Sequence, residues 1–447
     1  MKNWTKHTLI TRWIAPALLA AGGLGSAHAA DANTNADVEC PIKVGVLHSL
    51  SGTMAISEST LKDTALMLIK QQNEKGGLLG CDLEPVVVDP ASDWPLFAEK
   101  ARQLLAQEKV DVVFGTWTSV SRKSVLPVFE ELNGLLFYPV QYEGEESSRN
   151  IVYTGAAPNQ QAIPAVNYLM NQVGIERWVL LGTDYVYPRT TNKILEQYLK
   201  DQGVADSDIM VNYTPFGHSD WQSIVSRVKA FGSMGKPTAV VSTINGDANV
   251  PFYKELANQQ ISAADIPVVA FSVGEQELSG IDTDPLLGHL AAWNYFQSID
   301  TPANERFIEN WHEYTGDDDR VTNDPMEATY IGFNLWVKAV KKAGTTDVDT
   351  VIDTLPGLKV DNLTGGTAEL LSNHHITKPV YIGEITDNGQ FSVVWETDEE
   401  IPGDAWSDFL PDSKKLKADW VELDCGHYNT ETEECSGQMS DMAEDEE

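Results

Sequence analysis

The sequence predicts an α/β fold made of two doubly wound, Rossmann-like lobes joined by a hinge of several strands. Short apolar runs alternate along the chain with amphipathic helical stretches, a pattern typical of parallel sheets with helices on both faces. The apolar runs also outnumber the roughly five strands that one doubly wound sheet needs, which indicates two sheets. They lie at residues 42–47, 85–88, 110–114, 134–137, 178–181, 239–241 and 266–271.

The N-terminal segment, residues 1–30, has the pattern of a secretory signal peptide. A basic start precedes a short apolar run at residues 13–24, and Ala27-His28-Ala29 matches a cleavage site. No stretch of the sequence reaches the roughly 20 apolar residues that a membrane helix needs. We therefore expect an exported, periplasmic protein that is not itself membrane-spanning.

The remaining elements divide between the two expected lobes. The first lobe should comprise residues 40–156 and about 291–375, and the second residues 157–290 and about 376–410. Amphipathic helices at 59–73 and 96–107 belong to the first lobe, and helices at 304–314 and 325–343 return to it. Short alternating runs at 381–385 and 391–395 close the second lobe. Residues 411–447 form an acidic, cysteine-containing tail.

The balance of charge excludes two classes of partner. The formal net charge of the chain is -35, and an excess of this sign disfavours nucleic acid and anionic lipid surfaces. A solvated acidic surface is the simplest interpretation.

Four cysteines are present, and the expected compartment is oxidising. Cys40 and Cys81 each precede an apolar run, so adjacent parallel strands would bring their sulfurs to one sheet edge. Cys425 and Cys435 would close a short loop in the tail. Zinc binding is the alternative, but no C-x-x-C pair supports it.

The candidate binding residues follow the apolar runs, because ligands of open α/β sheets bind beyond the carboxyl ends of the strands. Aromatic side chains are concentrated there, and basic side chains are absent until the following helices begin at Arg122 and Arg189. The first lobe contributes Trp117, Thr118, Ser119, Tyr138, Val140, Gln141 and Tyr142, and the second contributes Asp184, Tyr185, Tyr187, Asn245, Gly246, Asp247 and Ser272.

These side chains suit a small, flat, neutral molecule with several N–H donors and one carbonyl. Asp184, Asp247 and the Gln141 oxygen can accept hydrogen bonds, and the hydroxyls of Thr118 and Ser119 can donate them. A strongly anionic ligand would normally require arginine. The alternative interpretation is ordinary local structure, in which Thr118 and Ser119 cap a helix and residues 245–247 form a turn.

Several of these segments resemble those of a known family. They include FYPVQYEG at residues 137–144, GAAPNQQ at 155–161, DYVYPR at 184–189 and STINGDANVPFY at 242–253. Over residues 42–395 the chain resembles the type I periplasmic solute-binding proteins of ABC transporters, specifically the urea-binding branch. The composite of GAAPNQQ and DYVYPR is also similar to a cytoplasmic short-chain amide sensor.

The resemblance implies a ligand and a partner. Positions that match the sensor's pocket are Thr118-Ser119, the segment from Tyr138 to Tyr142, Tyr185 and Tyr187. Val140 and Gln141 depart from the sensor's threonine and proline, which suggests a backbone role for Val140 and an added amide at Gln141. That departure favours urea over acetamide, delivered by lobe closure to an ABC transporter permease in the inner membrane.

Other functions remain open at this stage. A branched-chain or other amino acid binder would share the fold, and Asp184 or Asp247 could pair with its ammonium group. A secreted amide hydrolase is the alternative from another class, but the sequence contains no G-x-S-x-G and no H-E-x-x-H. His374-His375 lies in a polar stretch and is expected at the surface. No cofactor is expected, since an acidic loop is a simpler interpretation of Asp317-Asp318-Asp319 than a calcium site.

Overall fold

The computed structural model describes residues 38–279, 281–410, 427–429 and 434–436. The predicted signal peptide, residues 1–30, and most of the predicted tail lie outside the described residues, so both stay predictions.

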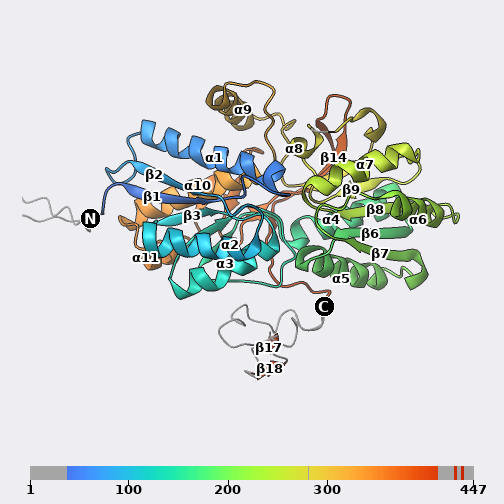
Figure 1. Cartoon of the computed structure of the whole chain (residues 1–447), viewed down its shortest axis with the longest axis horizontal. Coiled ribbons are helices and arrows are strands. Elements are labelled where there is room, and N and C mark those ends of the chain that lie inside the picture. The colour runs from blue at the N-terminus through green and yellow to red at the C-terminus, as the bar shows by residue number, and fades with distance from the viewer. Residues whose placement is uncertain (1–37, 280, 411–426, 430–433, 437–447) are drawn as a thin grey trace, which may run out of the picture. The chain divides into compact units, whose positions relative to one another are not determined.

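The first sheet consists of parallel strands in the order β2-β1-β3-β4-β5. These strands are β1 (Ile42–Leu47), β2 (Leu83–Val88), β3 (Val112–Gly115), β4 (Leu136–Tyr138) and β5 (Ile151–Tyr153). Its helices are α1 (Ala55–Glu74), α2 (Trp94–Arg102), α3 (Ser119–Glu131), α9 (Pro302–Thr315), α10 (Asp324–Ala343) and α11 (Val348–Thr354), coloured from blue and teal for α1 to α3 through gold-brown for α9 to orange for α10 and α11 in Figure 1. We call this sheet and its helices the first lobe.

The second sheet has the order β15-β14-β10-β9-β8-β6-β7, and only β14 and β15 run antiparallel to their neighbours. Its strands are β6 (Arg177–Thr183), β7 (Ile209–Thr214), β8 (Thr238–Thr243), β9 (Val268–Ala270), β10 (Leu290–Trp293), β14 (Tyr381–Ile385) and β15 (Phe391–Glu396). Its helices are α4 (Ala162–Tyr168), α5 (Val186–Asp201), α6 (Gln222–Gly232), α7 (Asn249–Asn258) and α8 (Glu275–Leu278). We call this sheet and its helices the second lobe.

Two kinds of short element complete the described chain. Helical turns flank the larger elements at Gln103–Glu108, Pro158–Gln160, Leu169–Val173, Asp206–Asp208, Gly246–Ala248 and Asp284–Leu286. Small ribbons pair β11 (Lys359–Asp361) with β12 (Thr367–Glu369), β13 (Thr377–Lys378) with β16 (Ile401–Pro402), and β17 (His427–Asn429) with β18 (Glu434–Ser436).

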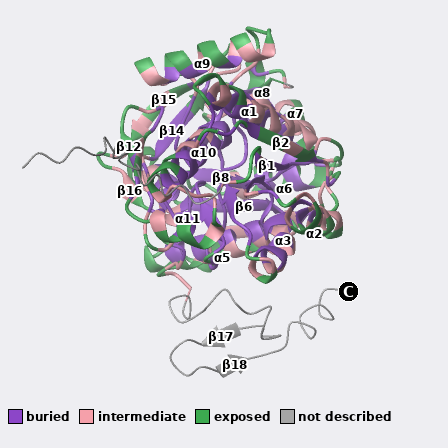
Figure 2. Cartoon of the chain, turned by 90° about the vertical axis from the view of Figure 1, so that its left-hand side faces the viewer, coloured by how far each residue is buried: buried purple, intermediate pink, exposed green. Residues whose placement is uncertain are grey.

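Apolar side chains fill both faces of each sheet. The strands are buried and the outer sides of the helices are exposed in Figure 2. Helix α10 closes one face of the first sheet, where Phe333 and Trp336 pack against Phe114 of β3. Asn323 caps its N-terminus, and its chain turns at Gly344 with a φ of +71°. The predicted return of this helix places a large apolar face over the strands that carry candidate residues.

Three strands of the two large sheets were not predicted from the sequence, for identifiable reasons. β5 is only three residues long, β7 is a half-exposed edge strand without a continuous apolar run, and β10 is rich in alanine. The strands that were expected are all present, with ends that differ by a few residues.

Cys40 and Cys81 form a disulfide at the start of β1 and β2, with their Cα atoms 5.3 Å apart. The parallel register of Ile42 with Leu83 explains why the two cysteines meet. This prediction is confirmed. The pairing of Cys425 with Cys435 stays a prediction, because Cys425 lies outside the described residues.

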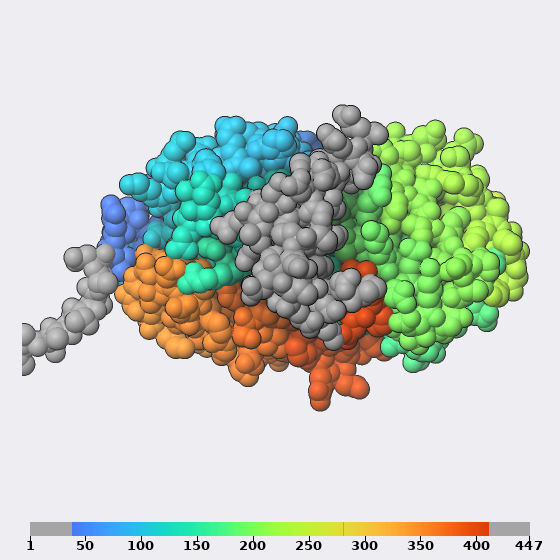
Figure 3. Space-filling model, turned by 90° about the horizontal axis from the view of Figure 1, so that it is seen from below, coloured from blue at the N-terminus to red at the C-terminus, as the bar shows by residue number. Residues whose placement is uncertain are grey.

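The lobes are joined where the chain passes between the sheets after β5, after β10 and before β14. Asn294 donates from its amide to the carbonyl oxygen of Gln160 at 2.9 Å and from its backbone to Asp324 at 3.0 Å. The buried Lys378 donates to the carbonyl oxygen of Thr154 at 3.1 Å. Hydrogen bonds therefore tie the connecting segments to one another. Seen from below, the segments of the two lobes occupy opposite sides of the face (Figure 3).

Helix α8 contacts both the first lobe and a connecting segment through buried carboxyl groups. Glu277 accepts a hydrogen bond from the Ser57 hydroxyl of α1 at 2.6 Å. Glu275 accepts from the backbone N–H of Gln297 at 2.7 Å. Burial raises the pKa of Glu275 to about 8, and the nearby charges of Glu277 and Asp324 act in the same direction.

The stability of the Glu275→Gln variant, relative to that of wild type, should increase as the pH rises. The folded protein retains the Glu275 proton up to about pH 8, whereas the unfolded chain releases it near the ordinary value of 4.5. The stability contributed by the protonated group is therefore complete below pH 4.5 and lost as the pH rises to 8. Guanidinium chloride unfolding at pH 5 and pH 8 should show a variant-minus-wild-type difference that grows by at least about 1 kcal/mol.

The exposed Glu309→Gln on α9 is the matched control, and its difference from wild type should not change with pH. An equal difference for Glu275→Gln at both pH values would contradict the assignment of a protonated carboxyl to this position.

Candidate functional site

The first turn of α3 follows β3 and carries two of the predicted hydroxyl groups. The Thr118 hydroxyl accepts from the backbone N–H of Ser121 at 3.1 Å and donates to the Ser121 hydroxyl at 3.0 Å. The Ser119 hydroxyl donates to the Glu143 carboxylate in a short hydrogen bond. Both hydroxyls thus have protein partners. The contacts of Thr118 are those of the N-cap of α3, as the alternative interpretation proposed.

Tyrosine rings form a stacked wall beyond β4 and β5. The Tyr138 hydroxyl donates to the carbonyl oxygen of Trp117 at 2.7 Å, and the Tyr142 hydroxyl donates to the carbonyl oxygen of Glu146 at 3.0 Å. The rings of Tyr142 and Tyr153 stack with centroids 5.1 Å apart. The predicted residues Tyr138 and Tyr142 therefore lie in one rigid aromatic cluster.

A fully buried arginine, Arg122, lies against this wall. Its guanidinium carbon is 4.8 Å from the ring centre of Tyr138 and 4.6 Å from that of Tyr142. It donates to Glu146 at 2.6 Å, to Glu143 at 3.2 Å and to Ser119 at 3.1 Å. The guanidinium fork is thus shared between two carboxylates and a hydroxyl.

The charges of this cluster stabilise one another. Burial by itself raises the pKa of Glu146, but Arg122 and Lys123 outweigh it and lower that pKa to about 2. Burial lowers the pKa of Arg122, and Glu146 and Glu143 more than compensate, so that it lies well above its ordinary value. Arg122 and Glu146 are therefore ionised at neutral pH.

The second lobe contributes a separate pair of tyrosines at the start of α5. Tyr187 is buried and Tyr185 is half-buried, with ring centres 6.1 Å apart. The Tyr185 ring packs on Phe216 at 4.8 Å, and Phe216 packs on Trp94 of the first lobe at 5.3 Å. Burial raises the pKa of both phenols. This aromatic contact brings the two lobes together beside the candidate site.

Gln141 links the lobes directly. Its side-chain nitrogen donates to the carbonyl oxygen of Phe271 at 2.8 Å and to the Ser272 hydroxyl at 2.9 Å, both in the second lobe. Gly246 also lies at the contact, since a Cβ added there would be 2.8 Å from the carbonyl oxygen of Thr53. Its φ of +67° independently favours glycine.

Two buried polar atoms of predicted site residues, Trp117 Nε1 and Asn245 Oδ1, have no hydrogen-bond partner among the described residues. Gln141 Oε1 and Tyr187 OH form no hydrogen bond of regular geometry there either, although Ser272 and Gln141 lie close enough to the Tyr187 phenol for hydrogen bonding to offset part of the rise that burial causes in its pKa. Unpaired buried polar groups are uncommon because each costs free energy. The set offers one N–H donor, two amide oxygen acceptors and a phenol that can do either.

Among the other predicted residues, the two aspartates lie at the surface. Asp184 has an exposed side chain and forms an ion pair with Arg189 at 2.5 Å, and Asp247 is exposed. The acceptor role that the sequence assigned to these carboxylates therefore fits the amide oxygens of Gln141 and Asn245 better. Val140 is buried, and its backbone packs against Gly155.

The candidate site residues predicted from the sequence did not include Arg122, Glu143, Glu146 or His375. The expectation that His374 and His375 lie at the surface is wrong, since both are buried. The His375 ring stacks on Tyr153 with centroids 4.6 Å apart, and burial lowers its pKa to about 4. The glutamates close to Tyr142 in sequence were a signal that this segment could carry a charged cluster, although they did not identify Arg122 as the cation that buried carboxylates require.

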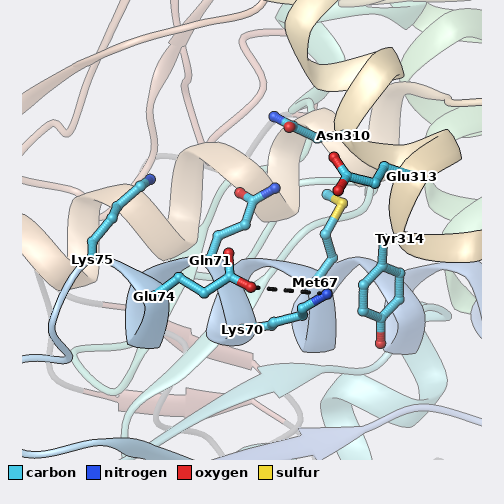
Figure 4. A pocket seen from close by; sticks show the side chains of 8 residues that line it. All are labelled: Met67, Lys70, Gln71, Glu74, Lys75, Asn310, Glu313 and Tyr314. Atoms are coloured by element: carbon cyan, nitrogen blue, oxygen red, sulfur yellow. Dashed lines mark ion pairs between the residues drawn. The ribbon is translucent and has the colours of Figure 1, made fainter.

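Within the described part of the chain, no group of three or more His, Cys, Asp or Glu side chains could hold a metal ion. A surface groove of about 290 Å³ lies between α1 and α9 (Figure 4). Lys70 and Glu74 form an ion pair in this groove at 3.9 Å, marked by the dashed line in Figure 4, and both side chains are mostly exposed. The groove lacks the buried polar atoms that distinguish the strand ends.

Comparisons with known proteins bear on this arrangement. A family model described as a periplasmic binding protein domain matches residues 42–412. The Leu/Ile/Val-binding protein homolog 6 of Brucella melitensis biotype 1 is 22% identical over 365 residues, which cover 78% of this chain and 89% of that protein. A limonene hydroxylase of Geobacillus stearothermophilus is 32% identical over 115 residues, but the match spans only 26% of this chain and 21% of that protein.

Among solved structures, a solute-binding protein of an ABC transporter from Rhodopseudomonas palustris HaA2 was crystallised in complex with p-hydroxybenzoic acid. It is 24% identical with a TM-score of 0.71, and the match covers 82% of this chain and 98% of that chain. This likeness confirms the predicted two-lobed α/β fold. Among the described helices, none has the length and apolar character needed to cross a membrane.

Substituting Gln141→Leu should loosen the contact between the lobes. The change removes both hydrogen bonds to the second lobe and leaves the Phe271 carbonyl and Ser272 hydroxyl without this donor. We expect guanidinium chloride unfolding to show a loss of about 1–3 kcal/mol. Gln197→Leu, which removes an exposed glutamine on α5, should change stability by less than about 0.5 kcal/mol. Equal stabilities for the two variants would contradict a structural role for the Gln141 amide.

Proposed function

The chain belongs to the periplasmic binding protein family, and we propose that it captures urea or a short-chain amide between its lobes and delivers it to an ABC transporter permease in the inner membrane. The observation that carries this proposal is the set of buried polar atoms on Trp117, Gln141, Tyr187 and Asn245 that form no hydrogen bond of regular geometry among the described residues. Their chemistry complements a small neutral amide.

Urea presents four N–H donors and one carbonyl acceptor on a planar frame. The oxygens of Gln141 and Asn245 can accept from the ligand, and Trp117 Nε1 can donate to its carbonyl. Because the Gln141 nitrogen is already bonded to the second lobe, only its oxygen remains for a ligand. A closed site must satisfy such groups, since each unpaired one costs about 1–3 kcal/mol.

The electrostatics of the site also favour a neutral ligand. Arg122 is the buried cation nearest the tyrosine wall, and its donors are already bonded to Glu143, Glu146 and Ser119. A ligand carboxylate would need a free guanidinium fork or a comparable donor set. The site instead offers aromatic faces and uncharged amides.

Closure of the lobes is the proposed mechanism of capture. Ligand contacts come from both lobes, so a bound molecule stabilises the arrangement in which Gln141 reaches Ser272 and Gly246 approaches Thr53. The connecting segments supply the hinge. The predicted signal peptide would place the protein in the periplasm, where its ligand and the permease meet.

An amino acid ligand is the second candidate, because a relative covering most of the chain is named as a Leu/Ile/Val-binding protein homolog. Such a ligand carries both an ammonium and a carboxylate. The exposed positions of Asp184 and Asp247 leave the ammonium without an evident buried partner among the predicted residues, which favours the amide.

Isothermal titration with urea, acetamide, formamide and leucine tests the proposal. We expect urea to bind at least about tenfold more tightly than leucine, which corresponds to about 1.4 kcal/mol. The reverse order would overturn the proposal. Recovery of the urea unchanged after incubation distinguishes binding from hydrolysis by a secreted amidase.

Tyr185→Ala should weaken amide binding by roughly tenfold with little loss of stability. The half-buried ring lies beside Tyr187 and contributes an aromatic face to the site, and loss of such a contact costs about 1 kcal/mol or more. Tyr168→Ala, which removes another half-buried tyrosine of the second lobe, is the matched control and should leave affinity unchanged. Equal affinities for wild type and Tyr185→Ala would remove Tyr185 from the site.

A further inference from the structure

The carboxylate of Glu143 is bonded to two donor groups of the candidate site. It is 1% exposed, accepts a short hydrogen bond from the Ser119 hydroxyl, and accepts from Arg122 at 3.2 Å. Ser119 is a predicted site residue, and Arg122 packs on the site tyrosines Tyr138 and Tyr142. Glu143 therefore takes up donors that an anionic ligand could use.

Glu143 and Glu146 share the same arginine but face different surroundings. The carboxylate of Glu146 accepts from the Tyr153 hydroxyl at 2.9 Å and from Lys123 at 2.8 Å, both inside the first lobe. Glu143 instead accepts from the hydroxyl of Ser119, which is one of the predicted site residues, and from Arg122. Of the two carboxylates, Glu143 is thus the one bonded directly to a predicted site residue.

We propose that Glu143 determines ligand specificity by excluding carboxylate-bearing molecules while admitting neutral amides. The inference rests on the proposed function, because it assumes that small amides bind between the lobes. A carboxylate placed beside Glu143 would meet a fixed like charge in a buried setting, where repulsion is poorly screened. An amide of the same size carries no charge and escapes this repulsion.

The relation between the two glutamates predicts what each substitution does. Replacing Glu143 with glutamine removes the like charge and leaves Arg122 with a single carboxylate partner, so the site becomes locally positive. It also frees the Ser119 hydroxyl from its charged acceptor. Replacing Glu146 with glutamine makes a matched change of charge on the same arginine but leaves the Glu143 carboxylate bonded to Ser119.

Acetamide and acetate are suitable probes, because they differ in little besides the amide and the carboxylate. Their affinities should be measured by isothermal titration at pH 7.5 for the full mature protein, for Glu143→Gln and for Glu146→Gln. We expect wild type to prefer acetamide by at least roughly a hundredfold, and Glu143→Gln to narrow this preference by at least tenfold through a gain in acetate affinity. Glu146→Gln should gain no acetate affinity.

The possible outcomes separate this inference from the proposed function. If wild type binds acetamide and Glu143→Gln still rejects acetate, the specificity role of Glu143 is wrong while the proposed function stands. If Glu146→Gln gains acetate affinity equally, the effect belongs to the whole cluster and the role assigned to Glu143 is overturned. If wild type binds neither urea nor acetamide, the proposed function fails.

A second variant serves as a control in case Glu143→Gln fails to fold. Should the near-ultraviolet circular dichroism of Glu143→Gln show that it does not fold, Glu143→Met removes the same charge with a side chain of similar length. The acetate and acetamide affinities of that variant then decide between the same outcomes.

Discussion

The guanidinium group of Arg122 is fully buried. Several residues that the first lobe contributes to the candidate site pack against it or bond to it. A buried charge of this kind is tolerated only when its donors are matched by acceptors. Glu143 and Glu146 provide that match from the segment that follows β4, and the tyrosine rings provide aromatic faces on which the cation packs. The start of α3 and the segment after β4 are therefore held together by one ionic cluster, and the positions of Ser119, Tyr138 and Tyr142 follow from it.

The two lobes contribute to the site in different ways. The first lobe offers a rigid wall whose polar groups are mostly bonded within the lobe. The second lobe offers Tyr187, Asn245 and Ser272 at the ends of its own strands, and it meets the first lobe through Gln141 and the packing of Phe216 on Trp94. Because the cross-lobe contacts are few and the within-lobe contacts are dense, movement of one lobe against the other would change the site without disturbing either core.

Much of this arrangement could be predicted from the sequence, because its strongest signals are local. Alternating apolar runs and amphipathic stretches indicate parallel sheets, and polar aromatic residues after the strands indicate where the lobes face each other. The short strand β5 and the half-exposed edge strand β7 lack such a signal. The position of Arg122 could not be predicted either, since a basic residue in the first turn of a helix is usually solvated and its burial depends on glutamates about 20 residues away. His375 was misplaced for the same reason: its partners, Tyr142 and Tyr153, are distant in the chain.

Neither lobe is continuous in sequence. Helix α10, which covers the first sheet, comes after the five strands β6 to β10 of the second sheet, and β14 and β15 come later still. During synthesis the first sheet is therefore complete in sequence at residue 153, but the helix that covers it begins only at residue 324. Neither lobe can bury its full core until the segments after β10 are made, so native structure would form late. Such late folding suits the export that the sequence of residues 1–30 predicts.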